Sequence, residues 1–156
     1  MATEKEKTEK VMELEWLTIY GLALGMWELF GESSFAATKI IGDLILSRME
    51  MESGLEIQGE SLENILIELQ RLLSDETSLF ESGNTVLEND RILFSCNNCL
   101  GTSGCNELQE MDVQPFYCAV YNVVTAALRT RQGKQCRFIS RKMDKQTCVL
   151  EMQIMN

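Results

Sequence analysis

The segment from Phe116 to Ile154 constrains the fold more than any other part of the chain. Its first half carries apolar residues at helical spacing and stops at Gly133, a residue that suits the end of a helix. Two stretches follow in which apolar and polar residues alternate, which is the pattern of half-buried strands. The segment therefore predicts a helix packed on a C-terminal β-hairpin.

The alternation also predicts the register of this hairpin. With a three-residue turn at 143–145, Phe138 pairs with Leu150, and the apolar residues of both strands share one face. In that register Cys136 and Cys148 lie about four residues, or ~13 Å, apart along the sheet. The two cysteines are therefore not expected to form a disulfide with each other or to bind one metal ion together.

Helical periodicity predicts three helices upstream, at residues 3–30, 35–50 and 61–73. Gly21, Gly25 and Gly42 fall inside the first two, although glycine costs about 1 kcal/mol relative to alanine in a helix. Close approach of a neighbouring helix is the expected reason for all three glycines.

Short strands are predicted between the third helix and the C-terminal segment, at residues 78–80, 85–88 and 91–96. Asn89 and Asp90 suit a tight turn between the last two strands. Residues 97–113, which contain two glycines, are predicted to form a loop. The expected fold class is α/β of the α+β type: three N-terminal helices, a short antiparallel sheet, one further helix and a C-terminal β-hairpin.

Length and charge narrow the possible functions. A chain of 156 residues with a single proline is expected to form one domain over residues 1–156. A net charge of −10 argues against nucleic-acid binding, because it repels phosphate groups. The chain has no histidine, the commonest general base, and it shows no nucleophile elbow or phosphate-binding glycine loop, so an enzyme is not indicated.

The same sequence gives no sign of a signal peptide or membrane span. Residues 2–10 mix both charges, and the longest uncharged apolar run, Trp16 to Trp27, is shorter than the roughly 20 residues that a span requires. The expected location is the cytoplasm, where thiols stay reduced.

Five of the six cysteines are candidate metal ligands: Cys96, Cys99, Cys105, Cys118 and Cys148. Cys96 and Cys99 have the C-x2-C spacing that lets two thiolates reach one zinc ion, and Gly101 and Gly104 would let the loop fold back to Cys105. Cys118 falls in the first turn of the C-terminal helix, where the helix dipole favours a thiolate. Two alternatives remain open: the thiols are inert and buried, or Cys96 and Cys99 are redox-active.

The C-terminal unit resembles the 4-vinyl reductase domain. The resemblance rests on a helix that starts near Cys118 and ends at Gly133, followed by a hairpin that ends in Cys-Val-Leu-Glu at residues 148–151. The chain also resembles, more loosely, the subunits of the transport protein particle (TRAPP). In those subunits a helix is followed by a strand with Cys-Arg-Phe and then by the last strand, in the same order as here. The resemblance implies an α+β domain, often a homodimer, that holds a small apolar (hydrocarbon-like) molecule or serves in sensing or tethering.

The resemblance also implies a zinc site that this sequence matches only in part. Cys118 and Cys148 match its first and last ligands, whereas its two middle ligands fall near Ser140 and Met143, which cannot replace them. Cys96, Cys99 and Cys105 are then the expected substitutes. The function predicted from the sequence is an apolar-ligand-binding or sensing domain with a cysteine-ligated zinc site. The alternatives are a homodimeric interaction or tethering module without ligand, or a thiol redox protein.

Overall fold

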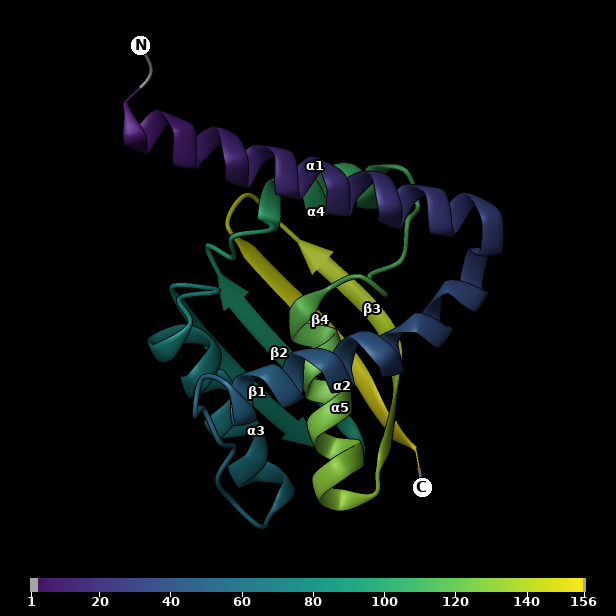
Figure 1. The fold of residues 1–156 in the computed structure, drawn as a ribbon. Coiled ribbons are helices and arrows are strands. Elements are labelled where there is room, and N and C mark those ends of the chain that lie inside the picture. Colours follow the sequence, from purple (N-terminus) through teal and green to yellow (C-terminus); the bar gives the residue numbers. More distant parts are fainter. Residues whose placement is uncertain (1–2, 156) are drawn as a thin grey trace.

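The computed structural model describes residues 3–155, and one four-stranded sheet organises them (Figure 1). Its helical elements are α1 (Glu4–Phe30), the 3-10 turn η1 (Gly31–Phe35), α2 (Ala36–Met51), α3 (Leu62–Arg71), the π-helical turn η2 (Leu72–Glu76), α4 (Thr102–Glu110) and α5 (Ala119–Gln132). Its strands are β1 (Ser82–Glu88), β2 (Arg91–Asn97), β3 (Gln135–Met143) and β4 (Thr147–Met155).

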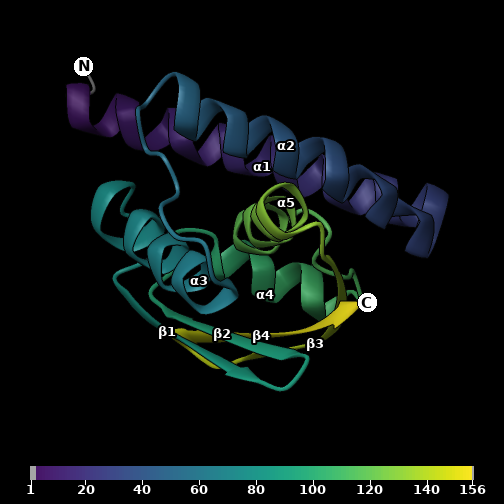
Figure 2. The same cartoon turned by 90° about the horizontal axis from the view of Figure 1, so that it is seen from below.

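All neighbouring strands are antiparallel, and their order is β1-β2-β4-β3. Figure 2 shows the helices stacked on one face of the sheet, with α3, α4 and α5 next to the strands and α1 and α2 outside them. The inner face carries alternate residues of the two central strands, among them Phe94, Leu150 and Met152, which are essentially inaccessible to solvent. The alternation of apolar and polar residues along the strands therefore gives a sheet with one buried face, as the sequence predicted.

The predicted fold class is confirmed. The three N-terminal helices, the antiparallel sheet, the fourth long helix and the closing hairpin are all present. α1 starts with a capping box, in which the Thr3 hydroxyl accepts from the Glu6 amide while the Glu6 carboxylate accepts from the Thr3 amide. Ser61 caps α3 by accepting from the Asn64 amide.

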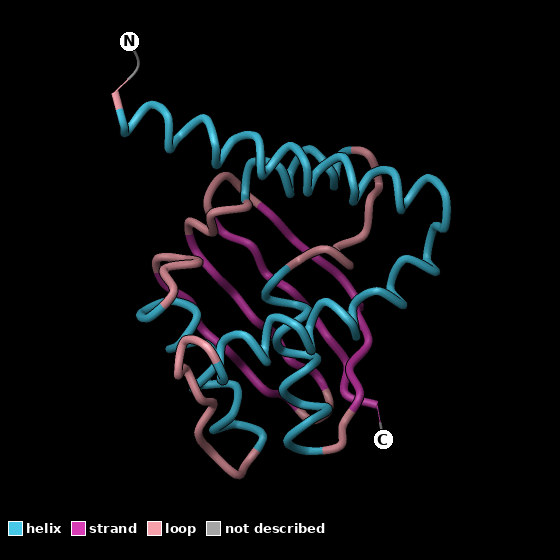
Figure 3. The backbone as a smooth tube through the Cα atoms, in the orientation of Figure 1, coloured by secondary structure: helices cyan, strands magenta, loops and turns pink. Residues whose placement is uncertain are grey.

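Two predicted elements between α3 and α5 are wrong. Residues 78–80 are not a strand, because the helix runs on through η2 and the first strand starts only at Ser82. Part of the predicted loop 97–113 is helix α4, which follows directly after β2 and lies beneath α1 (Figures 1 and 3). A Cβ at Gly104 would overlap the Trp16 indole, so the glycine that suggested a loop provides the close contact between α1 and α4.

The predicted hairpin register is also wrong, and the predicted faces hold only as far as Phe138. Beyond it Ser140 pairs with Glu151 and Arg141 pairs with the buried Leu150, the reverse of the predicted faces. Phe138 pairs with Met152 rather than Leu150, and a β-bulge between Phe138 and Ser140 shifts the rest of the strand by one residue. The turn begins one residue later than predicted, because the Asp144 carboxylate accepts from two amides of the turn. Cys136 pairs with Ile154, so Cys136 and Cys148 are well separated along the sheet, as expected.

The glycines of α1 and α2 differ in their surroundings. A Cβ at Gly42 would overlap the Asn122 carbonyl oxygen and come within 3.0 Å of the Ala126 Cβ, so α2 and α5 approach to backbone contact there as predicted. Nothing in the described chain lies within 4 Å of a Cβ built at Gly21 or Gly25. The predicted close approach at these two glycines is therefore wrong within a single chain.

None of the helices in the described part of the chain is long and apolar enough to cross a membrane.

Candidate functional site

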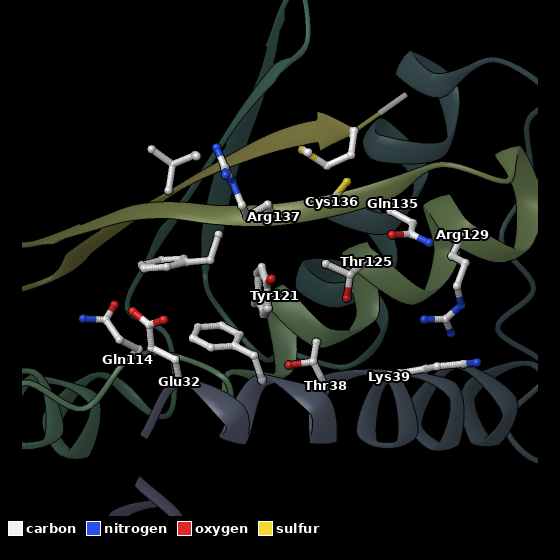
Figure 4. Close-up of a pocket in the computed structure, with 14 residues that line it drawn as sticks. Glu32, Thr38, Lys39, Gln114, Tyr121, Thr125, Arg129, Gln135, Cys136 and Arg137 are labelled. Atoms are coloured by element: carbon white, nitrogen blue, oxygen red, sulfur yellow. The ribbon is translucent and has the colours of Figure 1, made fainter. Parts of the chain in front are cut away.

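A cavity of about 980 Å³ opens between α2, α5 and β3 (Figure 4). One wall is aromatic: the rings of Phe35 and Phe138 stack with centroids 5.9 Å apart, and Tyr121 meets both edge-on, at 5.9 Å and 6.1 Å. Phe35 ends η1, Tyr121 comes from the first turns of α5, and Phe138 comes from β3. Three elements that are distant in sequence thus converge to build an apolar surface for a flat or chain-like ligand.

The other side of the cavity carries a hydroxyl without a partner. Thr38 on α2 lines the cavity and is only 8% exposed, yet its Oγ1 has no hydrogen-bond partner within residues 3–155. Three other helical threonines, Thr8, Thr18 and Thr130, donate to the carbonyl four residues earlier. A buried hydroxyl that is left unpaired costs about 1–3 kcal/mol. The Oγ1 atom is itself closed off from solvent, so this hydroxyl is an unpaired buried group beside the cavity rather than a contact that a bound molecule reaches directly.

The two ends of the cavity differ in charge. Arg129 and Lys39 lie at one end, and Glu32 and Gln114 lie at the other (Figure 4). The Arg129 guanidinium forms a salt bridge with Asp43, which fixes it at the rim. Burial raises the pKa of the Tyr121 phenol to about 12, so this ring carries no charge at neutral pH.

The predicted metal ligands gather at a second place, where β2 ends, β4 begins and α4 follows. Cys96 and Cys148 are register partners on neighbouring strands, and both are buried. Asn98 then takes a left-handed backbone, with φ of 52°, and its amide donates to the Gln146 carbonyl at 2.7 Å. This turn folds the chain back and sets Cys99 beside Cys96.

Cys96 lies at the centre of this group. It is the register partner of Cys148, and Cys99 packs against the same buried cluster. The two neighbouring thiols, together with burial, raise the pKa of the Cys96 thiol far above its usual range. The neighbouring Cys96 and the Gly101 amide lower the pKa of Cys99 to about 6, and Cys96 lowers the pKa of Cys148 as well.

A guanidinium lies next to these thiols, which the sequence had not suggested. Arg141 of β3 donates to the Tyr117 hydroxyl at 2.9 Å and to the Gln109 side-chain oxygen at 3.1 Å. Its positive charge helps to lower the pKa of Cys148 and opposes the rise in the pKa of Cys105. Arg141 therefore supplies charge compensation for a thiolate without any bound ion.

The remaining cysteines differ from the prediction in their chemistry. Burial raises the pKa of Cys105 to about 11 and that of Cys118 still further. Cys118 is the N-cap residue of α5, and there desolvation outweighs the hydrogen bond from the Tyr121 backbone, so its pKa lies above the usual range rather than below it. Cys136 lies apart, in the cavity wall, and burial raises its pKa to about 11.

The thiols do not fit a zinc ion as they lie. A tetrahedral zinc–thiolate site sets its sulfurs about 3.8 Å from one another, given a Zn–S distance of about 2.3 Å, so each ligand must contact the others. Within residues 3–155, no group of three or more cysteine or carboxylate side chains is arranged to hold a metal ion. Zinc ligation by Cys96, Cys99, Cys105, Cys118 and Cys148 stays a prediction, which metal analysis of the purified protein tests.

Comparison with known proteins does not assign the chain to a family. No family model matches it, and no curated protein does. Among solved structures, the chain is similar to a mutant H-NOX protein of T. Tengcongensis, with 10% sequence identity and a TM-score of 0.43 over 84% of this chain and 68% of the other. A likeness at this level carries no inference about function.

Proposed function

We propose that this chain is a small-molecule-binding domain and that its ligand occupies the cavity between α2, α5 and β3. The volume of about 980 Å³ lies at the upper end of the range typical of ligand sites. More than half of the residues that line it are polar or charged, so the aromatic wall is one apolar side of a mixed site.

The observation that carries this proposal is the aromatic group of Phe35, Tyr121 and Phe138 in the cavity wall. Arg129 and Lys39 lie at one end of the same cavity (Figure 4). These groups together suit a molecule with an apolar body and an anionic or strongly polar end near Arg129 and Lys39. The resemblance to the 4-vinyl reductase domain, which implies a hydrocarbon-like ligand, supports the same proposal.

Binding is tested with the probe 8-anilinonaphthalene-1-sulfonate, which combines aromatic rings with an anionic group. We expect one probe per chain, and Thr38→Phe should abolish binding because the added ring fills the cavity. The same change at an exposed helical site, Thr8→Phe, serves as the control and should leave binding intact. Probe binding that is unaffected by Thr38→Phe, in a protein that still unfolds cooperatively, would place the bound probe elsewhere and remove the proposal.

The substitution Thr38→Val tests the contribution of the hydroxyl to stability without changing the shape of the cavity. Valine has nearly the same volume as threonine, so the change deletes a buried, unpaired polar group. We expect the free energy of unfolding to rise by about 1 kcal/mol without ligand. Urea denaturation measures it, with Thr18→Val as the matched control, because the Thr18 hydroxyl is already bonded to the Leu14 carbonyl. A clear loss of stability in Thr38→Val would show that the hydroxyl is satisfied in solution.

A second candidate function, homodimeric interaction or tethering, is favoured by the outer face of α1. At 3.6 residues per turn, Val11, Leu14, Leu22, Gly25 and Leu29 fall on one stripe of that helix. The four apolar side chains of this stripe are between 53% and 77% exposed. The stripe lies opposite the face that packs on the body, and Gly25 leaves room for a second helix. An uncovered apolar stripe of this kind marks an interaction surface.

Sedimentation velocity tests the second candidate. We expect a dimer at micromolar concentration and a monomer for Leu22→Glu, because the carboxylate would be buried at the centre of the stripe. Ile67→Glu, at an equally exposed position of α3, is the control and should remain dimeric. A wild-type protein that sediments as a monomer would remove this candidate.

A further inference from the structure

The group formed by Cys96, Cys99 and Cys148 has the arrangement that thiol–disulfide exchange requires. Exchange proceeds when a thiolate attacks one sulfur of a disulfide, so a shared sulfur must be within reach of two others. Cys96 and Cys148 are register partners on neighbouring strands, and Cys99, three residues after Cys96, packs against the same buried cluster. Cys96 is thus placed as the sulfur shared by the other two.

The backbone permits both possible bonds. Cys96 and Cys148 are register partners on antiparallel strands, where Cα atoms are about 4.5–5.5 Å apart, within the usual range for a disulfide. Cys96 and Cys99 are separated by two residues, and the left-handed Asn98 turns Cys99 back towards Cys96. Neither bond requires a strand to change its register.

The three cysteines also differ in solvent exposure, and this difference predicts the order in which they react. Cys99 is half-buried at the mouth of the group, whereas Cys96 and Cys148 lie inside. Cys99 is therefore the sulfur of this group that an external reagent meets first, and Cys96, three residues earlier, is placed to react next.

We propose that Cys96, Cys99 and Cys148 form a dithiol–disulfide switch, in which Cys99 reacts with a small-molecule disulfide and Cys96 completes the intramolecular bond. This site is separate from the ligand cavity, and the proposal does not depend on the function proposed above.

The reaction balances in two steps. The Cys99 thiolate attacks a disulfide RS–SR, forms the mixed disulfide Cys99–S–SR and releases RS⁻. The Cys96 sulfur then attacks the Cys99 sulfur, forms the Cys96–Cys99 disulfide, and releases the second RS⁻, while its own proton passes to a released thiolate. Two protein thiols are oxidised and one external disulfide is reduced to two thiols. Cys148 can afterwards attack the Cys96 sulfur and release Cys99, which moves the bond to the strand pair without further oxidation.

Oxidised glutathione is the probe for this switch. The full-length protein is reduced, treated with EDTA and mixed with the probe, and the products are followed by intact mass and by peptide mapping without reduction. We expect a glutathione adduct on Cys99 that converts to a disulfide involving Cys96. In Cys99→Ser the initial rate should fall at least about tenfold, because the more exposed thiol of the group is removed and Cys96 and Cys148 are buried.

Cys96→Ser gives the more specific result. With the resolving thiol removed, the glutathione adduct should accumulate on Cys99 rather than disappear. Cys136→Ser, on the far part of β3, is the control and should behave as wild type. Equal labelling of all the cysteines, or rapid loss of the adduct in Cys96→Ser, would overturn the proposal. A protein that purifies with one zinc ion per chain and resists the probe until EDTA is added would also overturn it and would favour the metal site.

Discussion

Replacing Asn122 with aspartate is expected to make the stability of this protein strongly dependent on pH. Asn122 on α5 is fully buried, and its amide donates to the Phe116 carbonyl at 2.9 Å, while its own oxygen has no partner in the described chain. A protonated aspartic acid can donate the same bond. An ionised one cannot, and its charge would be buried without compensation.

The direction of this dependence follows from where the proton is held. Burial raises the pKa of the introduced carboxyl in the folded state, so the folded state holds the proton after the unfolded state has lost it. Stability relative to wild type should therefore be nearly normal below the unfolded pKa, about pH 4, and fall as pH rises. By pH 7 the loss should reach about 4 kcal/mol, because fully buried carboxyl groups commonly resist ionisation up to that pH.

Urea denaturation at pH 4 and pH 7, with wild type at each pH, measures this effect. Asn84→Asp makes the same chemical change on the exposed part of β1 and should differ little from wild type at either pH. An Asn122→Asp protein that is equally stable at both pH values would contradict the buried position of this side chain.

Gly42→Ala is expected to destabilise the protein by about 3 kcal/mol, towards the upper end for overpacking. The new Cβ would overlap the Asn122 carbonyl oxygen, and backbone cannot rotate away as a long side chain can. For a chain of this size the melting temperature should fall by about 6–12 °C. Differential scanning calorimetry measures the change.

Gly25→Ala provides the matched control for this prediction. It is the same substitution within a helix, but nothing lies within 4 Å of the added Cβ. We expect it to stabilise α1 by up to about 1 kcal/mol through helix propensity. If Gly42→Ala were also neutral or stabilising, α2 and α5 would lie further apart than described.

The sequence was sufficient to predict the elements whose period is long and regular. α1, α3 and α5 follow an apolar repeat with clear ends, such as Ser61 and Gly133, and were placed within one to three residues. α4 was missed because its sequence, with glycine, serine and asparagine, has poor helix propensity, and packing of Gly104 against Trp16 stabilises it instead. The predicted register of β3 was wrong because a β-bulge depends on three-dimensional packing, which the alternation of apolar and polar residues does not reveal.

The candidate sites, like the secondary structure, could be predicted from the sequence only in part. Cysteine spacing correctly singled out Cys96 and Cys99, and the strand pairing then brought Cys148 to them. Arg141 could not be predicted as their neighbour, because it depends on the fold of α4 against β3. The cavity gave no sequence signal at all, since Phe35, Thr38 and Phe138 resemble ordinary core residues of three separate elements.

The contact at Gly42 has a mechanical consequence. It brings the backbones of α2 and α5 together about one turn after Thr38, whose buried side chain lines the cavity. Asp43 and Glu50 of α2 also pair with Arg129 and Arg131 of α5, so α2 is held to α5 from Gly42 onwards. Any change in the volume of the cavity must be absorbed by the first turn of α2, which is joined through the five-residue η1 to α1. With a length of about 40 Å, α1 would convert a small rotation at that joint into a displacement of several ångströms at its far end.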